Sequence, residues 1–240
     1  MLKIDHQNLY HSFHYKKFAG KSLDWCSTDS KILYDKNYLE NFELLKSNGW
    51  IDTKFKYTFN SHGFRSDEFS SSPSIMFLGC SYTMGIGLPI ENVWSTIVAK
   101  QLNIGYTNLA VGGGANDTAF RLCLGWIDKI KPKMVILLQP PEFRIELVNN
   151  YKNRVILVSN YDTNSNFFEE WSITDDNNYL NSLKNTLAIK SLCNDRNIKY
   201  YYFNHTQLSV NPIDLARDLG HVGPKTHLRF AEYVLEQIEK

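Results

Sequence analysis

The fold is decided by a stretch in which an apolar run ends abruptly in small and hydroxyl residues, Phe77-Leu78-Gly79-Cys80-Ser81-Tyr82-Thr83-Met84-Gly85. The apolar run is typical of a buried strand, and the residues after it are typical of a tight turn. Open α/β folds place their ligands at the carboxyl ends of the strands. The stretch therefore brings one hydroxyl, that of Ser81, to the edge of a sheet and makes it a candidate nucleophile.

After this stretch, short apolar runs alternate with segments of helical period. The runs predict strands over 75–78, 106–109, 134–138 and 199–203, and helices over 94–102, 118–130, 180–194 and 224–238. Strands separated by helices need crossover connections, which make the strands parallel and cover both faces of the sheet. The predicted class is α/β, a three-layer α/β/α sandwich with a mostly parallel sheet.

The first part of the chain has a different composition. Residues 1–72 are rich in aromatic and polar side chains and show little sustained period, although 38–47 is typical of a short helix. We interpret 1–72 as an N-terminal extension that packs on a main domain, residues 73–240. Within that domain, 139–178 combines a predicted strand at 154–159 with polar loops, which indicates an insertion near the site.

Composition excludes several classes of partner. The 240 residues carry 26 basic and 25 acidic side chains, a net charge of +1, and no basic run that would attract nucleic acid. Residues 1–10 lack the apolar core of a signal peptide, and nowhere do about 18 apolar residues follow one another. We expect a soluble cytoplasmic protein with no membrane partner. The oligomeric state does not follow from the sequence.

The four cysteines, Cys26, Cys80, Cys123 and Cys193, are scattered and form no Cys-x-x-Cys pair. Neither a zinc site nor a disulfide framework is indicated, and buried reduced thiols are the simpler interpretation. The histidines form no ligand grouping either. We therefore expect no metal and no cofactor.

A second candidate element lies near the C-terminus, in Asp218-Leu219-Gly220-His221-Val222-Gly223-Pro224. Proline is favoured in the first turn of a helix, so a helix is expected to begin at Pro224. An aspartate three residues before a histidine can bind one imidazole nitrogen while the other nitrogen takes a serine proton. Ser81, Asp218 and His221 thus form a chemically complete set.

These motifs resemble the blocks of the SGNH (GDSL-like) hydrolase superfamily. The first block is similar to Gly79–Gly85, the second to Asn108-Leu109-Ala110-Val111-Gly112-Gly113, and the last to Asp218-x-x-His221. The resemblance covers roughly residues 60–240. It implies a flavodoxin-like sandwich in which Ser81 is the nucleophile, His221 the base and Asp218 its orienting acid. It also implies an oxyanion hole that uses the backbone N–H groups of Ser81 and Gly113.

The third block departs from the family pattern, which usually has Gly-x-Asn after the third strand. Here the expected asparagine position falls near Glu142, whose carboxylate would repel an oxyanion. Gln139 or Asn116 could supply the missing donor. The alternative for the glycine-rich turn before 118–130 is that Asn116 or Asp117 caps the helix.

The first block also departs from Gly-Asp-Ser, because Cys80 replaces the aspartate. A buried thiol is the simpler interpretation, since a nucleophilic cysteine needs a lowered pKa. The structural alternative for Ser81 is a serine that caps the following helix.

Three functions fit these residues. The first is a serine esterase or deacetylase that acts through an acyl-enzyme on an O-acyl ester of a small molecule or glycan. The second is a binding or structural module with the same sandwich and a weak or lost oxyanion site, because a fold does not guarantee chemistry. The third is an O-acyltransferase, which would use the same residues with an acceptor other than water.

Overall fold

A four-stranded parallel sheet forms the centre of the computed structural model, which describes residues 7–70, 74–149, 154–158 and 175–239. Its strands lie in the order β4 (Gly105–Asn108), β3 (Ser74–Leu78), β5 (Met134–Gln139) and β8 (Lys199–Asn204). Every neighbouring pair is parallel. The predicted parallel sheet is confirmed, and each strand end lies within one residue of its expected position.

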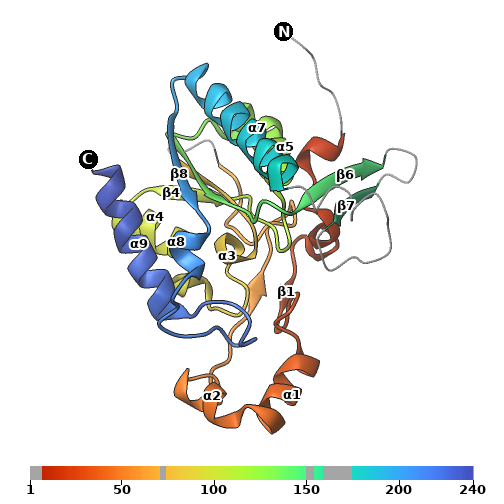
Figure 1. Cartoon of the computed structure of the whole chain (residues 1–240), viewed down its shortest axis with the longest axis vertical. Helices are drawn as coiled ribbons and strands as arrows, with labels where there is room; N and C mark the ends of the chain where they lie inside the picture. Colours follow the sequence, from red (N-terminus) through yellow and green to blue (C-terminus); the bar gives the residue numbers. More distant parts are fainter. Residues whose placement is uncertain (1–6, 71–73, 150–153, 159–174, 240) are drawn as a thin grey trace.

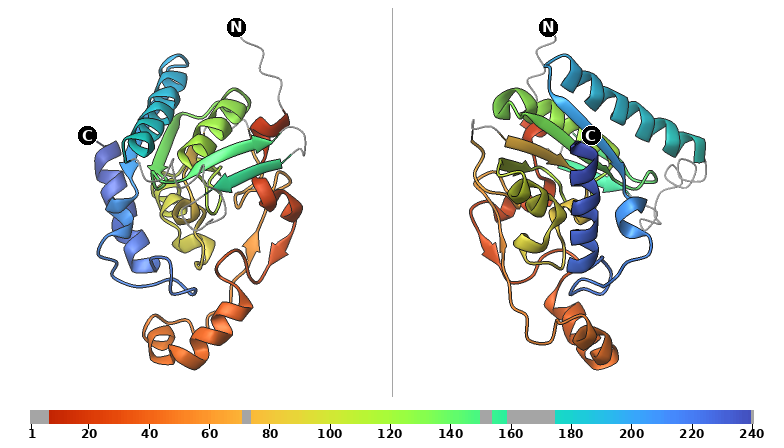
Figure 2. Two further views of the ribbon diagram at one scale, coloured as in Figure 1. Left: turned by 45° about the vertical axis from the view of Figure 1, so that its right-hand side comes forward. Right: turned by 90° about the vertical axis from the view of Figure 1, so that its left-hand side faces the viewer.

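Helices cover both faces of this sheet, as expected for a three-layer sandwich. α4 (Trp94–Gln101) and α9 (Pro224–Ile238) pack together on one face, and α5 (Asn116–Ile130) and α7 (Asp175–Asn194) pack together on the other (Figures 1 and 2). α9 begins at Pro224, as the sequence predicts.

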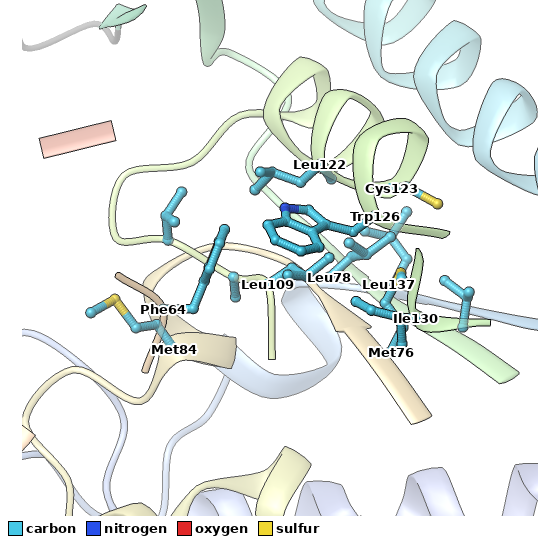
Figure 3. Packing of buried hydrophobic residues seen from close by; sticks show 14 of the residues in the cluster. Phe64, Met76, Leu78, Met84, Leu109, Leu122, Cys123, Trp126, Ile130 and Leu137 are labelled. Carbon is cyan, nitrogen blue, oxygen red and sulfur yellow. The ribbon is translucent and has the colours of Figure 1, made fainter. Parts of the chain in front are cut away.

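The side chains of β3 alternate between the two layers because successive residues of a strand point to opposite faces. Ile75 and Phe77 join the cluster that contains Trp94 and Phe230 of α4 and α9. Met76 and Leu78 join the opposite cluster, which also contains Leu137 of β5. Leu122, Trp126 and Ile130 of α5 cover this face of the sheet (Figure 3). Because β3 is buried on both faces, it reads as a continuous apolar run.

A β-hairpin follows the sheet strand β5. β6 (Ile145–Asn149) pairs antiparallel with β7 (Arg154–Val158), with Leu147 opposite Ile156. The predicted strand at 154–159 is therefore found, whereas its partner β6 was not expected from the sequence. The remaining short elements of this part are α3 (Ser81–Met84), η3 (Ile90–Asn92) and α8 (Thr206–Ser209).

We call residues 7–70 the N-terminal segment. Its elements are η1 (Gln7–Tyr10), η2 (Phe13–Phe18), β1 (Ser22–Leu23), α1 (Lys31–Glu40), α2 (Phe42–Ser47) and β2 (Tyr57–Thr58). β1 and β2 form a small antiparallel pair, and α1 and α2 project from the sandwich (Figures 1 and 2). The boundary expected between 72 and 73 lies outside the described residues.

The single short helix predicted over 38–47 is wrong. Two helices meet at Asn41, whose backbone is not helical, and the first begins seven residues earlier than expected. Ser30 caps α1 by accepting a hydrogen bond from the Leu33 N–H at 3.2 Å. A serine of this kind is a start signal that the sequence does contain.

The expected cap of α5 is also wrong. The helix begins at Asn116, after Ala115, so neither Asn116 nor Asp117 is in the cap position. The Asp117 carboxylate instead accepts hydrogen bonds from the side-chain amides of Asn181 and Asn185, at 3.1 and 2.9 Å. It therefore joins α5 to α7 through a polar contact.

No helix among the described residues has both the length and the apolar character of a membrane span.

Truncation of Leu137 tests the position of the core. Leu137 is 1% exposed between β3 and α5, so Leu137→Ala is expected to lower the free energy of unfolding by about 2–5 kcal/mol through lost burial and a cavity. Leu39→Ala removes the same atoms from a side chain that is 84% exposed and should cost about 0.5 kcal/mol or less. Urea denaturation measures both, and equal losses would contradict this core.

Candidate active site

Ser81 stands at the carboxyl end of the most buried strand. All five residues of β3 are buried, and after Gly79 and Cys80 the chain turns into α3, of which Ser81 is the first residue. Gly79 is required there because a Cβ would overlap the side chain of Thr83. Ser81 is 7% exposed, and Cys80 beside it is fully buried. The turn fixes the serine at the edge where the sequence places it.

Asp218 and His221 lie together in the loop before α9. Oδ2 of Asp218 is 2.7 Å from Nδ1 of His221. Oδ1 accepts hydrogen bonds from the backbone N–H groups of Gly220 and His221, at 3.1 and 3.0 Å. The loop thus forms the aspartate–histidine pair that the spacing predicts.

The charge state of Asp218 follows from these bonds. Burial raises the pKa of the carboxyl, but the hydrogen bonds and the charge of His221, with a further hydrogen bond from Thr28, outweigh it and hold the pKa below its ordinary value. An ionised carboxylate can only accept, so Nδ1 of His221 carries the proton. Nε2 is then left as the basic nitrogen of the ring.

The turn of Ser81 and the loop of His221 are neighbours in space. The backbone N–H of Arg217 donates to the Gly87 carbonyl at 3.1 Å. The ring of Tyr82, next to Ser81, meets the His221 ring edge-on, with centroids 5.3 Å apart. In the described part of the chain, no hydrogen bond joins Ser81 to His221, so the relay between them stays a prediction.

The second block lies against the first. The Leu109 N–H donates to the Phe77 carbonyl at 2.9 Å, and the Asn108 amide donates to the Thr83 carbonyl of α3 at 2.7 Å. Gly113 has a φ of +77°, which favours glycine. Within the described residues, neither the Ser81 nor the Gly113 backbone N–H has an acceptor. Both donors that the resemblance implies are therefore available.

The two candidates for a third donor are already engaged. Asn116 is buried, and its amide donates to the Pro140 carbonyl at 3.2 Å. The Gln139 amide donates to Ser182 of α7 and, at 3.2 Å, to Glu142. Its oxygen accepts from Tyr202 and, at 3.0 Å, from Asn204. An oxyanion role for either amide stays a prediction. The Asn116 amide uses one of its two N–H groups, whereas Gln139 uses both and would have to give up one of these bonds.

One residue at the site has no signal in the sequence. Thr28 of the N-terminal segment donates a hydrogen bond to Oδ2 of Asp218 at 2.6 Å. It belongs to no motif and lies 190 positions away from Asp218 along the chain.

Among the described residues, no three histidine, cysteine or acidic side chains gather in a way that could hold a metal ion.

His227, six positions after His221, is a structural residue. It is 1% exposed in α9, and its Nδ1 accepts the Trp94 N–H at the start of α4, at 3.1 Å. Burial, with smaller contributions from His221 and Arg65, lowers its pKa to about 3. His227 is therefore neutral and joins two helices on one face of the sheet.

The buried His227 predicts an acid-sensitive stability. The folded-state pKa of about 3 lies below the ordinary value of 6.5, so the contribution to stability is complete above pH 6.5 and is lost as the pH falls toward 3. His227→Asn keeps an acceptor for the Trp94 N–H and removes the titration. Between pH 6 and 4.5, unfolding free energy should fall more steeply in the wild type, by about 1.4 kcal/mol per pH unit. Urea denaturation at several pH values measures both proteins, and an equal pH dependence of the unfolding free energy in wild type and variant would contradict the prediction.

Comparison with known proteins gives distant likenesses. The sequence matches no protein-family model and no curated protein. The structure is similar to a psychrotrophic esterase, EstA, from Pseudoalteromonas sp., at 14% identity over 70% of this chain and 97% of that chain, with a TM-score of 0.40.

Two further solved structures are similar. One is an acetyl xylan esterase from Butyrivibrio proteoclasticus, at 14% identity over 77% of this chain and 65% of that one, with a TM-score of 0.40. The other is a family two carbohydrate esterase from Clostridium thermocellum, at 15% identity over 70% and 63%, with a TM-score of 0.38. Likenesses this distant carry no substrate or mechanism to the chain. In its own motifs the chain resembles the SGNH hydrolase superfamily, and the solved structures to which it is similar include esterases.

Proposed function

We propose that this protein is a serine esterase that hydrolyses an O-acyl ester through an acyl-enzyme. One observation carries the proposal: a buried, ionised Asp218 holds His221 by Nδ1, in a loop that contacts the turn of Ser81. An aspartate and a histidine in this arrangement leave Nε2 as a base for a nearby hydroxyl. Ser81 is the hydroxyl that the first block offers.

The proposed reaction has two steps. In the first, Ser81 Oγ attacks the ester carbonyl, its proton passes to His221 Nε2, and the alcohol leaves with that proton. In the second, water attacks the acyl-serine, His221 takes a proton from the water, and Ser81 regains a proton as the carboxylic acid departs. Asp218 stays ionised throughout and stabilises the imidazolium that forms in each step.

Backbone donors would stabilise the oxyanion. The Ser81 and Gly113 N–H groups have no acceptor among the described residues, which leaves them for the developing charge. The asparagine of the family's third block has no counterpart here, and Gln139 and Glu142 instead bond each other at 3.2 Å. Loss of one such donor slows an acyl-transfer enzyme by about 10²–10³ and leaves the mechanism intact. We therefore expect a slow enzyme.

The substrate is proposed as an ester of a small molecule or a glycan, including O-acetyl esters. The sequence motifs support this class because their resemblance implies acyl chemistry on such esters. The near-neutral charge of the chain also gives no general attraction for polyanions.

Ser81 and His221 are tested by replacement. Ser81→Ala and His221→Ala are each expected to lower kcat/KM for p-nitrophenyl acetate by about 10³-fold or more, since each removes one member of the relay. A fluorophosphonate should label the wild type at Ser81, as shown by peptide mass spectrometry.

Ser47→Ala is the matched control, because this exposed serine of α2 lies outside the site. It should keep both turnover and labelling. Full turnover in Ser81→Ala would overturn the esterase assignment. Saturable glycan binding that is unchanged in Ser81→Ala, with no labelling of the wild type, would identify the alternative binding module.

Hydrolysis and acyl transfer are separated by their products. With a p-nitrophenyl ester and a large excess of a sugar acceptor, a hydrolase releases nitrophenol and free acid in equal amounts, because water takes the acyl group. Chromatography of both products is expected to give this ratio. Free acid that falls as acylated sugar rises would identify the acyltransferase.

A further inference from the structure

The Asp218 carboxylate is held from two directions. Its side chain is 1% exposed, so its hydrogen bonds come from the protein. Three are made within its own loop, from two backbone N–H groups and from His221. The fourth comes from Thr28 Oγ1, at 2.6 Å on Oδ2, the same oxygen that binds His221 Nδ1.

We propose that Thr28 of the N-terminal segment is a positioning residue of the active site, which fixes the Asp218 carboxylate so that Oδ2 holds His221 in its basic tautomer. This inference rests on the proposed function. Thr28 touches neither the substrate nor the reacting atoms, and it acts through Asp218. The N-terminal segment thereby helps to set the geometry of the active site.

The turn that carries Thr28 is rigidly placed. Cys26 and Asp29 form an isolated β-bridge across it, with the Cys26 N–H 2.8 Å from the Asp29 carbonyl. The next residue, Asp29, is buried and forms an ion pair with Arg217 at 2.7 Å. The residues next to Thr28 and Asp218, Asp29 and Arg217, thus form a second contact beside the first. This arrangement holds the backbone of Thr28 beside the loop of Asp218.

A third contact connects the same two parts of the chain. The side-chain amide of Asn37, in α1, donates to the main-chain carbonyl of Asp218 at 3.4 Å. Asn37 is buried, so this bond is protected from water. Side chain and backbone of Asp218 are therefore both anchored to the N-terminal segment.

The turn also reaches the second block. A Cβ on Gly112 would overlap the hydroxyl of Tyr15, and Ser27 Oγ would lie 3.6 Å from it. Gly112 precedes Gly113, the proposed oxyanion donor. Residues of the N-terminal segment therefore contact both the loop that holds Asp218 and the second block that holds Gly113.

A carboxylate turns easily about its last torsion, because that torsion has no sharp minima. With Thr28 and His221 both on Oδ2 and two N–H groups on Oδ1, the carboxylate plane is determined. Without Thr28, Oδ2 keeps only the histidine, and only the two N–H groups on Oδ1 still oppose a rotation of the pair. The effect should appear in kcat, because the orientation of the base matters most when the proton moves.

The test compares Thr28→Val, which removes the hydroxyl at equal size, with Thr28→Ser, which keeps it. Thr28 is exposed, so valine disturbs little packing. Thr58→Val is the matched control, because Thr58 is an exposed threonine of the same segment whose hydroxyl bonds Ser22 at 3.0 Å. Thr28→Ala serves in place of valine if circular dichroism shows that the valine variant is unfolded.

Two measurements are made on each variant. In ester hydrolysis, Thr28→Val should lower kcat about ten-fold or more with KM changed less than about two-fold, since a hydrogen bond to a charged group is lost. In proton NMR, the His221 Nδ1–H signal should exchange with water faster in Thr28→Val. Thr28→Ser and Thr58→Val should match the wild type in both.

Each outcome decides the proposal. Unchanged kcat and exchange in Thr28→Val overturn it, and so does a loss that serine fails to restore, because the hydroxyl is then not the active group. If the wild type itself hydrolyses no ester, the proposed function fails, and the NMR comparison still decides whether Thr28 holds the pair.

Discussion

The buried ion pair between Asp29 and Arg217 is the interaction on which the site depends. Both side chains are almost fully buried, and the guanidinium carbon lies over the rings of Trp25 and Phe55, about 4 Å from each centroid. Removal of one partner of such a pair leaves an uncompensated buried charge, which costs about 3–5 kcal/mol. Since Arg217 precedes Asp218, the pair sets where the acid of the proposed relay lies.

Asp29 is also connected, through Tyr57, to the stretch that follows Ser81 and α3. Tyr57 donates its hydroxyl to Asp29 at 2.5 Å and accepts the Gly87 N–H at 2.7 Å, three residues after α3 ends. Arg65 binds three carbonyls of the same stretch, those of Met84, Gly85 and Leu88. The N-terminal segment thus joins the loop of His221 to the loop after Ser81, although these loops are over 130 residues apart in sequence.

The third block differs from the first two in what its side chains bind. Gln139, the last residue of β5, is the centre of a partly buried polar network with Ser182, Tyr202 and Asn204. Such networks are stable when every member is satisfied, and they resist change for the same reason. The departure from Gly-x-Asn therefore has a structural counterpart, because the amide of the last residue of β5 binds side chains of α7 and of the neighbouring strand β8.

The sequence by itself determined the parallel sheet and the Asp218–His221 pair. Apolar runs that alternate with helical segments indicate the sheet, and a three-residue spacing indicates the pair, and both signals are contained in neighbouring residues. It failed at Tyr38–Ser47, where the Ser30 cap decides the helix start, and at Asp117, whose carboxylate finds Asn181 and Asn185 on another helix. Only the tertiary structure decided that Thr28 binds Asp218. A single hydroxyl in a turn carries no period, and its partner is chosen by the packing of distant segments.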